Sequence, residues 1–318
     1  MAAPSLDPRP LGGTGLTVSS LCVGTSPLAS MPGLYGYEVD AEAAIATVRS
    51  VLDSPISFLD TSNGYGADGE SERRIGAAIA QAGGLPDGFV LATKVDPDPS
   101  TGDFSGSRAR ASVEESLERL GLDHLQVLYL HDPERISFEE GTAAGGAVEA
   151  MIALRDEGVV DHLGVAGGDL SVLTRYLRMG DFEIVLNHNR FTLVDQSAVP
   201  LMEETIERGA AFVNAAPYGG GMLAKGPDAQ PRYAYGTRGS ELRDRVLEMQ
   251  SACDEFGVSL AAAALQFSVR DSRVTSTVVG VSSPERVSQT LDLLAVNISD
   301  DLWAKLSALA PPAGSLLA

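Results

Sequence analysis

FLDTSNGYG, at residues 58–66, contains the pattern from which the architecture of this chain is inferred, and FVLATKV at 89–95 and VLYLHDP at 127–133 repeat it. In each stretch, a short apolar run of the kind that forms a buried strand ends at a polar side chain. These side chains are Asp60 and Tyr65 in the first stretch, Lys94 in the second and His131 in the third. Groups of this kind at successive strand ends predict an enzyme site for proton transfer at one end of a sheet.

The same pattern extends along the chain in both directions. Eight apolar runs are predicted as strands: 21–25, 56–60, 89–95, 125–131, 159–166, 183–188, 210–215 and 275–280. Helical patterns lie between them, for example at 107–120 and 147–157, where apolar residues share one face. Because alternating strands and helices form right-handed parallel crossovers, the sequence predicts an α/β fold, a (β/α)8 TIM barrel.

Three segments lie outside the eightfold pattern. Residues 11–20 are rich in glycine and predict a β-hairpin that caps the barrel floor. Residues 259–269 predict an extra helix before the last strand, and 299–309 predict a terminal helix with a serine cap. We therefore expect one domain over residues 1–318, with the barrel at 21–298 and a terminal helix and tail at 299–318.

Two connections, 132–146 and 217–240, are longer than most strand-to-helix loops of such barrels and rich in Gly and Pro. Each is compatible with a wall over a ligand site. A surface insertion is the alternative, and the sequence favours neither reading for either loop.

Composition limits the possible partners and compartment. The 318 residues are 44% hydrophobic and 21% charged, with a net charge of -20, which indicates a soluble globular protein and disfavours binding to nucleic acid. Cys22 and Cys253 lie far apart with no ligand-like spacing, so neither a disulfide framework nor a metal site is expected. No signal or membrane-spanning segment is evident. We expect a cytoplasmic monomer or small homo-oligomer without a membrane partner.

Several motifs together resemble the aldo-keto reductases over nearly the whole chain. They are LGGTGLTVS at 11–19, Asp60-Thr61 followed by Tyr65-Gly66 and Ser71-Glu72, Ala92-Thr93-Lys94, LYLH at 128–131, the glycine-bounded segment 158–164, and Gly280 followed by SPER at 283–286. The resemblance implies an oxidoreductase barrel that binds a nicotinamide cofactor without a Rossmann domain. It also implies that Asp60, Tyr65, Lys94 and His131 form the catalytic tetrad of the family.

The chemistry of such a tetrad explains its residue types. A phenol can exchange a proton with a carbonyl or hydroxyl oxygen, but the ordinary tyrosine pKa of roughly 10 suits neutral pH poorly. A buried Lys94 ammonium would favour the phenolate form of Tyr65, and Asp60 would hold Lys94 charged and in place. His131 would orient the substrate oxygen. Taken singly, Asp60 could be a turn residue, Tyr65 a packed loop aromatic and His131 a structural histidine.

The resemblance also implies a cofactor site. No GxGxxG motif follows a strand, and the family pattern points instead to the loop and helix start at 279–289. The implied contacts are Gly24, Thr25, Asp60, Asn187, Gly280, Ser282, Ser283, Arg286 and Gln289. Many NADP-dependent members carry Lys at the position of Gly280 and Glu-Asn at that of Gln289-Thr290. This departure favours NAD, although NADP remains open.

Two further departures concern the nicotinamide. The Ser-Asn pair that usually meets its amide is replaced by Ala166-Gly167-Gly168, and the stacking aromatic is replaced by Ala215. Asn187 and His188 lie near the position of the family's Gln.

The substrate is inferred from three motifs: LHDPE, NRFTLVDQSA and NAAPYGGGMLA. They look like the branch of aldose 1-dehydrogenases and of L-fucose, L-galactose and pyridoxal dehydrogenases. This implies a role in carbohydrate metabolism, in which the chain oxidises a sugar or sugar-like hemiacetal to a lactone. Expected substrate contacts are Tyr65, His131, Asp132 and Tyr218, with Asn187, His188 and Asn189 as further candidates by loop position.

Two alternatives remain open at this stage. One is an NADPH-dependent reductase of small aldehydes or ketones, which keeps the fold and reverses the reaction. The other is a non-enzymatic, cofactor-sensing subunit of an ion channel, which the acidic composition disfavours.

Overall fold

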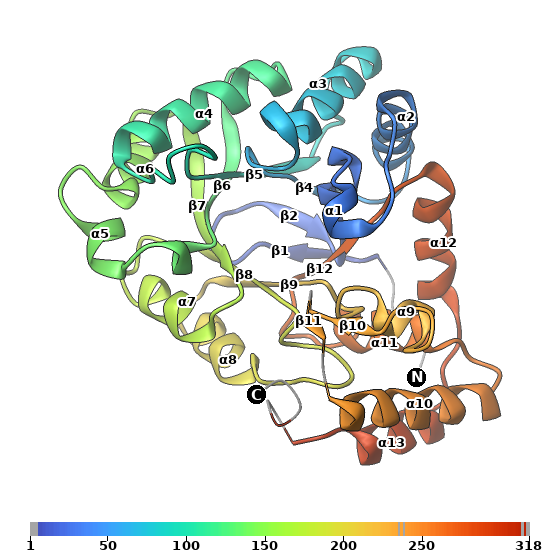
Figure 1. The fold of residues 1–318 in the computed structure, drawn as a ribbon. Helices are drawn as coiled ribbons and strands as arrows, with labels where there is room; N and C mark the ends of the chain where they lie inside the picture. Colours follow the sequence, from blue (N-terminus) through green and yellow to red (C-terminus); the bar gives the residue numbers. More distant parts are fainter. Residues whose placement is uncertain (1–5, 235, 238, 313–314, 316–318) are drawn as a thin grey trace.

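The computed structural model describes residues 6–234, 236–237, 239–312 and 315. Eight parallel strands close into a barrel in the order β12-β3-β4-β5-β6-β7-β8-β9 (Figure 1). Their bounds are β3 (Leu21–Gly24), β4 (Phe58–Asp60), β5 (Val90–Val95), β6 (Leu125–His131), β7 (Val160–Gly167), β8 (Ile184–His188), β9 (Ala211–Ala215) and β12 (Ser276–Gly280). The predicted (β/α)8 barrel is therefore confirmed, and each of its eight strands lies within a predicted run or extends one residue beyond it.

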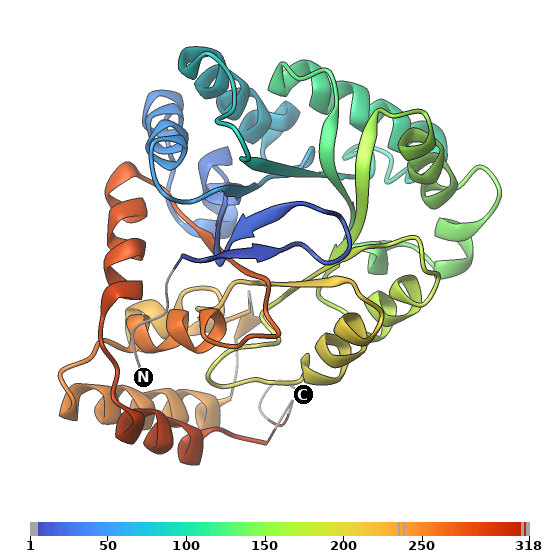
Figure 2. The same cartoon turned by 180° about the vertical axis from the view of Figure 1, so that it is seen from behind.

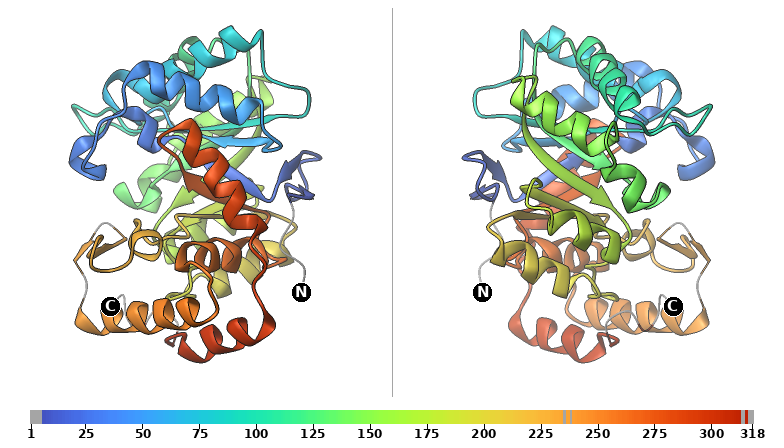
Figure 3. Two further views of the ribbon diagram at one scale, coloured as in Figure 1. Left: turned by 90° about the vertical axis from the view of Figure 1, so that its right-hand side faces the viewer. Right: turned by 90° about the vertical axis from the view of Figure 1, so that its left-hand side faces the viewer.

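Helices form a ring around the strands (Figures 1 and 3). They are α2 (Ala41–Leu52), α3 (Glu70–Ala82), α4 (Gly106–Leu120), α6 (Ala147–Asp156), α7 (Leu170–Leu177), α8 (Val199–Glu207), α11 (Leu260–Val269) and α12 (Pro284–Ala295). Several begin at a side chain that accepts from free backbone N–H groups, as Ser105 does for α4 and Asp169 for α7. Helix α4 ends at Gly121 in the left-handed conformation.

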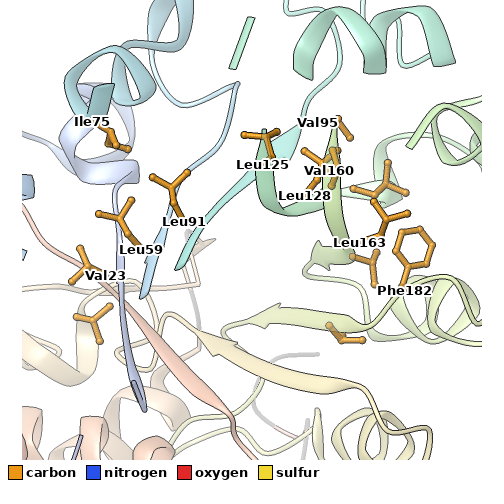
Figure 4. Close-up of a cluster of buried hydrophobic side chains, with 14 of the residues drawn as sticks. Val23, Leu59, Ile75, Leu91, Val95, Leu125, Leu128, Val160, Leu163 and Phe182 are labelled. Carbon is orange, nitrogen blue, oxygen red and sulfur yellow. The ribbon is translucent and has the colours of Figure 1, made fainter. Parts of the chain in front are cut away.

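The core has two layers because successive strand residues point to opposite faces. In β6, Val127 and Tyr129 belong to the cluster inside the barrel, while Leu128 and Leu130 belong to the cluster between barrel and helices. Figure 4 shows part of the outer cluster, with side chains from several strands directed at the surrounding helices. Burial on both faces explains why these strands appear in the sequence as continuous apolar runs.

An N-terminal hairpin covers the end of the barrel at which the strands begin (Figure 2). Strands β1 (Pro8–Pro10) and β2 (Thr17–Ser19) pair antiparallel, so the hairpin begins at Pro8, three residues before the predicted start at 11. The glycine-rich residues form its turn. Gly12 has a φ of 61°, and a Cβ there would lie 2.7 Å from Ala211 N, so this turn requires glycine where it meets the barrel.

Two helices pack beside the ring: α10 (Ser240–Glu255) and α13 (Asp300–Leu309) (Figures 1 and 3). Val246, Met249, Leu302 and Trp303 join them in a second apolar cluster. The predicted terminal helix is present with its Ser299 cap, whereas α10 was not predicted. Of the predicted tail, residues 313–314 and 316–318 lie outside the described residues. No helix among the described residues is both long and apolar enough to span a membrane.

Short elements occupy the loops at the other end of the barrel, where the strands finish. They are η1 (Ser26–Ala29), α1 (Pro32–Tyr35), η2 (Ala67–Gly69), η3 (Pro133–Arg135), α5 (Phe138–Thr142), α9 (Met222–Lys225), β10 (Arg232–Tyr233) and β11 (Gly236–Thr237). These loops surround the site described next.

Candidate active site

Four strand-end residues meet at the carboxyl end of the barrel. Asp60 is the last residue of β4, Lys94 is the penultimate residue of β5, and His131 is the last residue of β6. Tyr65 lies in the loop that follows β4. All four line one cavity of about 430 Å³. The structure thus brings together the side chains that the sequence pattern singled out, because parallel strands deliver their carboxyl ends to the same rim.

Lys94 and Asp60 form a buried ion pair. Lys94 Nζ lies 2.6 Å from Asp60 Oδ1 and also donates to the carbonyl oxygen of Thr61; the side chains of the pair are only 1% and 5% exposed. Burial raises the pKa of Asp60, and the charge and hydrogen bond of Lys94 oppose that rise. The ammonium is 4.9 Å from the centre of the Tyr65 ring, so a fixed positive charge lies directly beside the phenol.

The imidazole of His131 contacts the carboxylate of Asp96, a residue that the sequence analysis did not single out. Its Nδ1 is 2.7 Å from Asp96 Oδ1 and 3.1 Å from Ser62 Oγ. The ring stands edge-on to Tyr65, with centroids 5.7 Å apart and planes at 79°. Burial acts to raise the pKa of Asp96, but His131 and hydrogen bonds from Ser62 and Gly64 outweigh it and hold that pKa well below its usual value.

The cavity continues from these residues to the end of β12 and the start of α12. Gly24, Gly280, Ser282, Arg286 and Gln289 line this part. The N-terminus of a helix attracts anions, and here the Arg286 guanidinium adds a full positive charge. A cleft with a proton-transfer group at one end and an anion-attracting helix start at the other fits a nicotinamide dinucleotide.

Three residues expected at the cofactor do not line this cavity. Thr25 is fully buried and donates to the backbone oxygen of Asp60, 3.0 Å away. Asn187 is also fully buried and donates to Gly167 O. Alternation along β8 explains its placement, since Leu186 and His188 line the cavity and Asn187 points the other way. Ser283 lies outside the lining as the N-cap of α12.

The two long connections differ in their relation to the cavity. Residues between Tyr218 and Arg232 form part of its wall, as the first of the two alternatives for 217–240 requires. Within 132–146, Asp132 lines the cavity, but α5 packs against α6 instead. The sequence analysis also missed two cavity-lining cations, Lys225 and Arg232.

Glu134 explains the glycines at the end of β7. Its Oε1 accepts from Gly168 N at 2.8 Å, and a Cβ at Gly167 would lie 2.6 Å from its Oε2. A Cβ at Gly168 would lie 2.8 Å from Cε1 of His188. Glu134 and His188 therefore fill the space that larger side chains at these positions would need. Burial lowers the pKa of His188, which favours the neutral imidazole.

A second cavity of about 580 Å³ adjoins the first and shares Tyr65, His131, Asp132 and His188 with it. Leu34 and Tyr35 of α1 line both cavities, whereas the loop after β5 lines only the second. Asp132 Oδ1 is 3.8 Å from His131 Nε2, and Asp132 Oδ2 is 2.8 Å from Arg135. A carboxylate thus lies beside the imidazole in a space open to a polar molecule.

A closed parallel barrel with a buried Lys–Asp pair, a phenol and an imidazole at its carboxyl end, beside a cleft that reaches the start of α12, has the features of the class of barrel oxidoreductases. Comparison with known families is more specific. The model described as "Aldo/keto reductase family" matches residues 20–311, and the chain belongs to this family. The resemblance seen in the sequence is therefore confirmed, and the protein is an oxidoreductase enzyme.

Three curated relatives are similar over nearly their whole length. D-threo-aldose 1-dehydrogenase of a Pseudomonas species is 33% identical, covering 92% of this chain and 94% of the relative. Pyridoxal 4-dehydrogenase of Microbacterium luteolum is 29% identical, covering 94% and 96%. L-galactose dehydrogenase of Arabidopsis thaliana is 29% identical, covering 97% and 95%.

Among solved structures, the holo form of an aldo-keto reductase from Bacillus halodurans shares the fold. It superposes with a TM-score of 0.78 at 21% identity, over 97% of this chain and 98% of that chain.

Proposed function

We propose that this protein oxidises the cyclic hemiacetal of an aldose, or of a sugar-like compound, to a lactone, with a nicotinamide dinucleotide as hydride acceptor. The observation that carries the proposal is the meeting of Asp60, Tyr65, Lys94 and His131 in one cavity. Its substrate class is supported by the identity of 33% to a D-threo-aldose 1-dehydrogenase and by the similarity to an L-galactose dehydrogenase.

In the proposed reaction, Tyr65 is the general base. Its phenolate takes the proton of the anomeric hydroxyl while the hydrogen on the same carbon leaves as hydride and the carbon–oxygen double bond forms. The bound nicotinamide supplies the acceptor for that hydride. The Lys94 ammonium, 4.9 Å from the ring centre, stabilises the phenolate, and Asp60 fixes the ammonium through the 2.6 Å ion pair. His131 contacts the same substrate oxygen and orients it.

The remaining hydroxyl groups of a sugar need polar partners, since buried polar groups must be hydrogen-bonded. Asp132, Tyr218 and His188 line the cavity and are the proposed partners. Asn189 is less suited, because it lies outside the lining and its Nδ2 is directed at His188 Nδ1, 3.0 Å away.

We propose NAD as the preferred cofactor. The only cation among the described cavity-lining residues of the β12–α12 segment is Arg286, and its Nη1 donates to Gln289 Oε1 at 3.0 Å. Gly280 adds no charge there. A 2′-phosphate would therefore meet a single guanidinium in this segment, and one of its N–H groups already donates to Gln289, whereas the two hydroxyls of an NAD ribose need no cation.

A panel of cofactors and substrates tests the proposal. Purified protein is mixed with NAD or NADP and a set of aldoses, and NADH or NADPH formation is followed; the reverse panel uses NADH or NADPH with small aldehydes and ketones. We expect reduction of NAD with at least one aldose. Tyr65→Phe should lower kcat by several orders of magnitude, with cofactor affinity nearly unchanged. Tyr176→Phe is the matched control, because that hydroxyl is buried in α7, away from the site.

Other outcomes would contradict parts of the proposal. Absence of cofactor reduction with every sugar, together with efficient aldehyde reduction, would assign the protein as a reductase. Equal turnover by Tyr65→Phe and Tyr176→Phe would remove Tyr65 from the reaction.

A further inference from the structure

Asp132 lies between the two cavities, directly after His131 at the end of β6. It lines both cavities, and its side chain is 22% exposed. One carboxylate oxygen, Oδ2, accepts from the Arg135 guanidinium at 2.8 Å. The other, Oδ1, is 3.8 Å from His131 Nε2 and accepts no hydrogen bond from the described residues. The carboxylate is thus held by one oxygen and presents the other beside the imidazole.

The backbone indicates that this carboxylate has a role other than helix capping. Asp132 is the N-cap of η3, where an aspartate ordinarily accepts from backbone N–H groups, but its side chain makes no capping hydrogen bond. Its φ of 43° and ψ of 56° lie in the left-handed region, which is uncommon for residues with a side chain. Such conformations concentrate at active and ligand sites. The chain therefore turns so that the carboxylate lies next to His131.

We propose that Asp132 recognises the hydroxyl on the carbon next to the anomeric carbon, so that the enzyme selects hemiacetals with two neighbouring hydroxyl groups. This inference rests on the proposed function, which places the anomeric oxygen at Tyr65 and His131. The hydroxyl on C2 donates to Asp132 Oδ1. A carboxylate has only acceptor sites, so it suits a hydroxyl that keeps its proton, in contrast to the anomeric hydroxyl, which gives its proton to Tyr65.

The spacing of the two protein groups matches such a pair of hydroxyls. Neighbouring ring hydroxyls in a staggered arrangement have oxygens about 3 Å apart. Hydrogen bonds that run side by side from these oxygens end on protein atoms at a similar spacing, and His131 Nε2 and Asp132 Oδ1 are 3.8 Å apart. The second cavity, of about 580 Å³, begins at these two residues and has room for the rest of the sugar ring.

The alternative is that Asp132 serves only as a surface ion pair with Arg135. The Arg135 side chain is 51% exposed, and ion pairs of this kind contribute little to stability. An ion pair accounts for the position of Oδ2 but not for that of Oδ1 beside the imidazole. It also gives the protein no reason to prefer a sugar that has a hydroxyl on C2, so sugars that differ only at C2 distinguish the two roles.

Matched sugars test the proposal on the whole enzyme with NAD or NADP. D-glucose, D-galactose, L-fucose and D-ribose are each compared with their 2-deoxy forms. For every sugar that is oxidised, we expect kcat/KM to be about ten- to a hundredfold lower for the 2-deoxy form, because a hydrogen bond to a charged group is lost.

Two variants locate this preference in the chain. Asp132→Gly removes the carboxylate and keeps the left-handed backbone, so the ratio of kcat/KM between each sugar and its 2-deoxy form should fall to about one. Asp181→Gly is the matched control. Asp181 also lies near an arginine, with Arg155 at 4.0 Å, but it lines neither cavity, so this variant should keep the wild-type ratio.

A binding measurement makes the test independent of turnover. Tyr65→Phe, saturated with the cofactor, is titrated calorimetrically with each sugar, its 2-deoxy form and its 2-deoxy-2-fluoro form. Fluorine is similar in size to a hydroxyl group but has no proton to donate. Both analogues should therefore bind about tenfold or more weakly than the parent sugar.

Equal kcat/KM or equal Kd for the sugars and their analogues would overturn the proposal, as would a preference that persists in Asp132→Gly or the absence of any sugar binding. Sugars that bind with the expected preference but are not oxidised by wild type would support recognition by Asp132 and contradict the proposed function. The two failures are therefore distinguishable.

Discussion

Lys94 lies 2.6 Å from Asp60 in a part of the barrel where both side chains are almost completely buried. Removing one partner of such a pair leaves the other charge buried and uncompensated, which lowers the free energy of unfolding by about 3–5 kcal/mol. We expect Lys94→Met to lower the free energy of unfolding by about that amount and to abolish turnover. Chemical denaturation at pH 7 measures the first effect, and steady-state kinetics measure the second.

The double variant Asp60→Asn/Lys94→Met separates the two effects, because it removes both charges. It should regain most of the lost stability and remain inactive. An active double variant would show that the ammonium has no role in the proton transfer.

Asp96 also affects how stability depends on pH. Its folded-state pKa lies below the unfolded value of roughly 3.9, so it stabilises the fold above that pH, and the contribution is lost as pH falls toward the folded pKa. Between about pH 6 and pH 3, wild type should therefore lose more unfolding free energy than Asp96→Asn. Denaturation curves at several pH values measure this difference. Parallel pH profiles for the two proteins would contradict the expected coupling.

Of the residues in the site, Lys94 could be predicted from the sequence and Asp96 could not. Lys94 could be identified because a lysine near the end of a buried strand needs a charge partner. Asp96 could not, because it opens the sequence DPDPS, which has the composition of an exposed turn. Its contact with His131 depends on register between β5 and β6, where Lys94 pairs with Tyr129, and no local pattern encodes that register.

At the scale of elements, several helices begin at a cap that the sequence displays. Helix α7 begins at Asp169, whose carboxylate accepts from the N–H groups of Ser171 and Val172 at 2.8 and 3.0 Å. Asp169→Ala should destabilise the protein by about 1 kcal/mol, because those N–H groups lose their acceptor. Thermal and chemical denaturation measure the change. Turnover should stay at the wild-type level, since α7 contributes no cavity-lining residue among those described.

Helix α10 shows the opposite case. Its sequence, SELRDRVLEMQSACDE, is mostly polar and follows a loop rich in Gly and Pro, so the sequence analysis did not predict a helix there. Its apolar residues Val246 and Met249 are buried against α13, which lies about fifty residues further along the chain. A pairing between elements so far apart is a property of the tertiary structure, and the local pattern does not contain it.

At the scale of the whole molecule, the excess of 43 acidic over 23 basic side chains opposes compactness through mutual repulsion. Sodium chloride screens this repulsion, since the Debye length falls from about 30 Å at 0.01 M to about 10 Å at 0.1 M. We expect Tm to rise by a few degrees between these concentrations. Scanning calorimetry with an uncharged osmolyte as control measures the effect. A falling Tm would mean that surface ion pairs, such as Arg110 with Glu157 at 2.6 Å, outweigh the repulsion.

The first and last strands of the barrel meet each other, with Gly24 in register with Gly280, and both glycines line the first cavity, the proposed dinucleotide cleft. During synthesis on the ribosome, the nascent chain therefore lacks one side of that cleft until more than four-fifths of its length has emerged. We therefore expect catalytic activity only after β12 has paired with β3 and β9, and a protein truncated before β12 should be inactive.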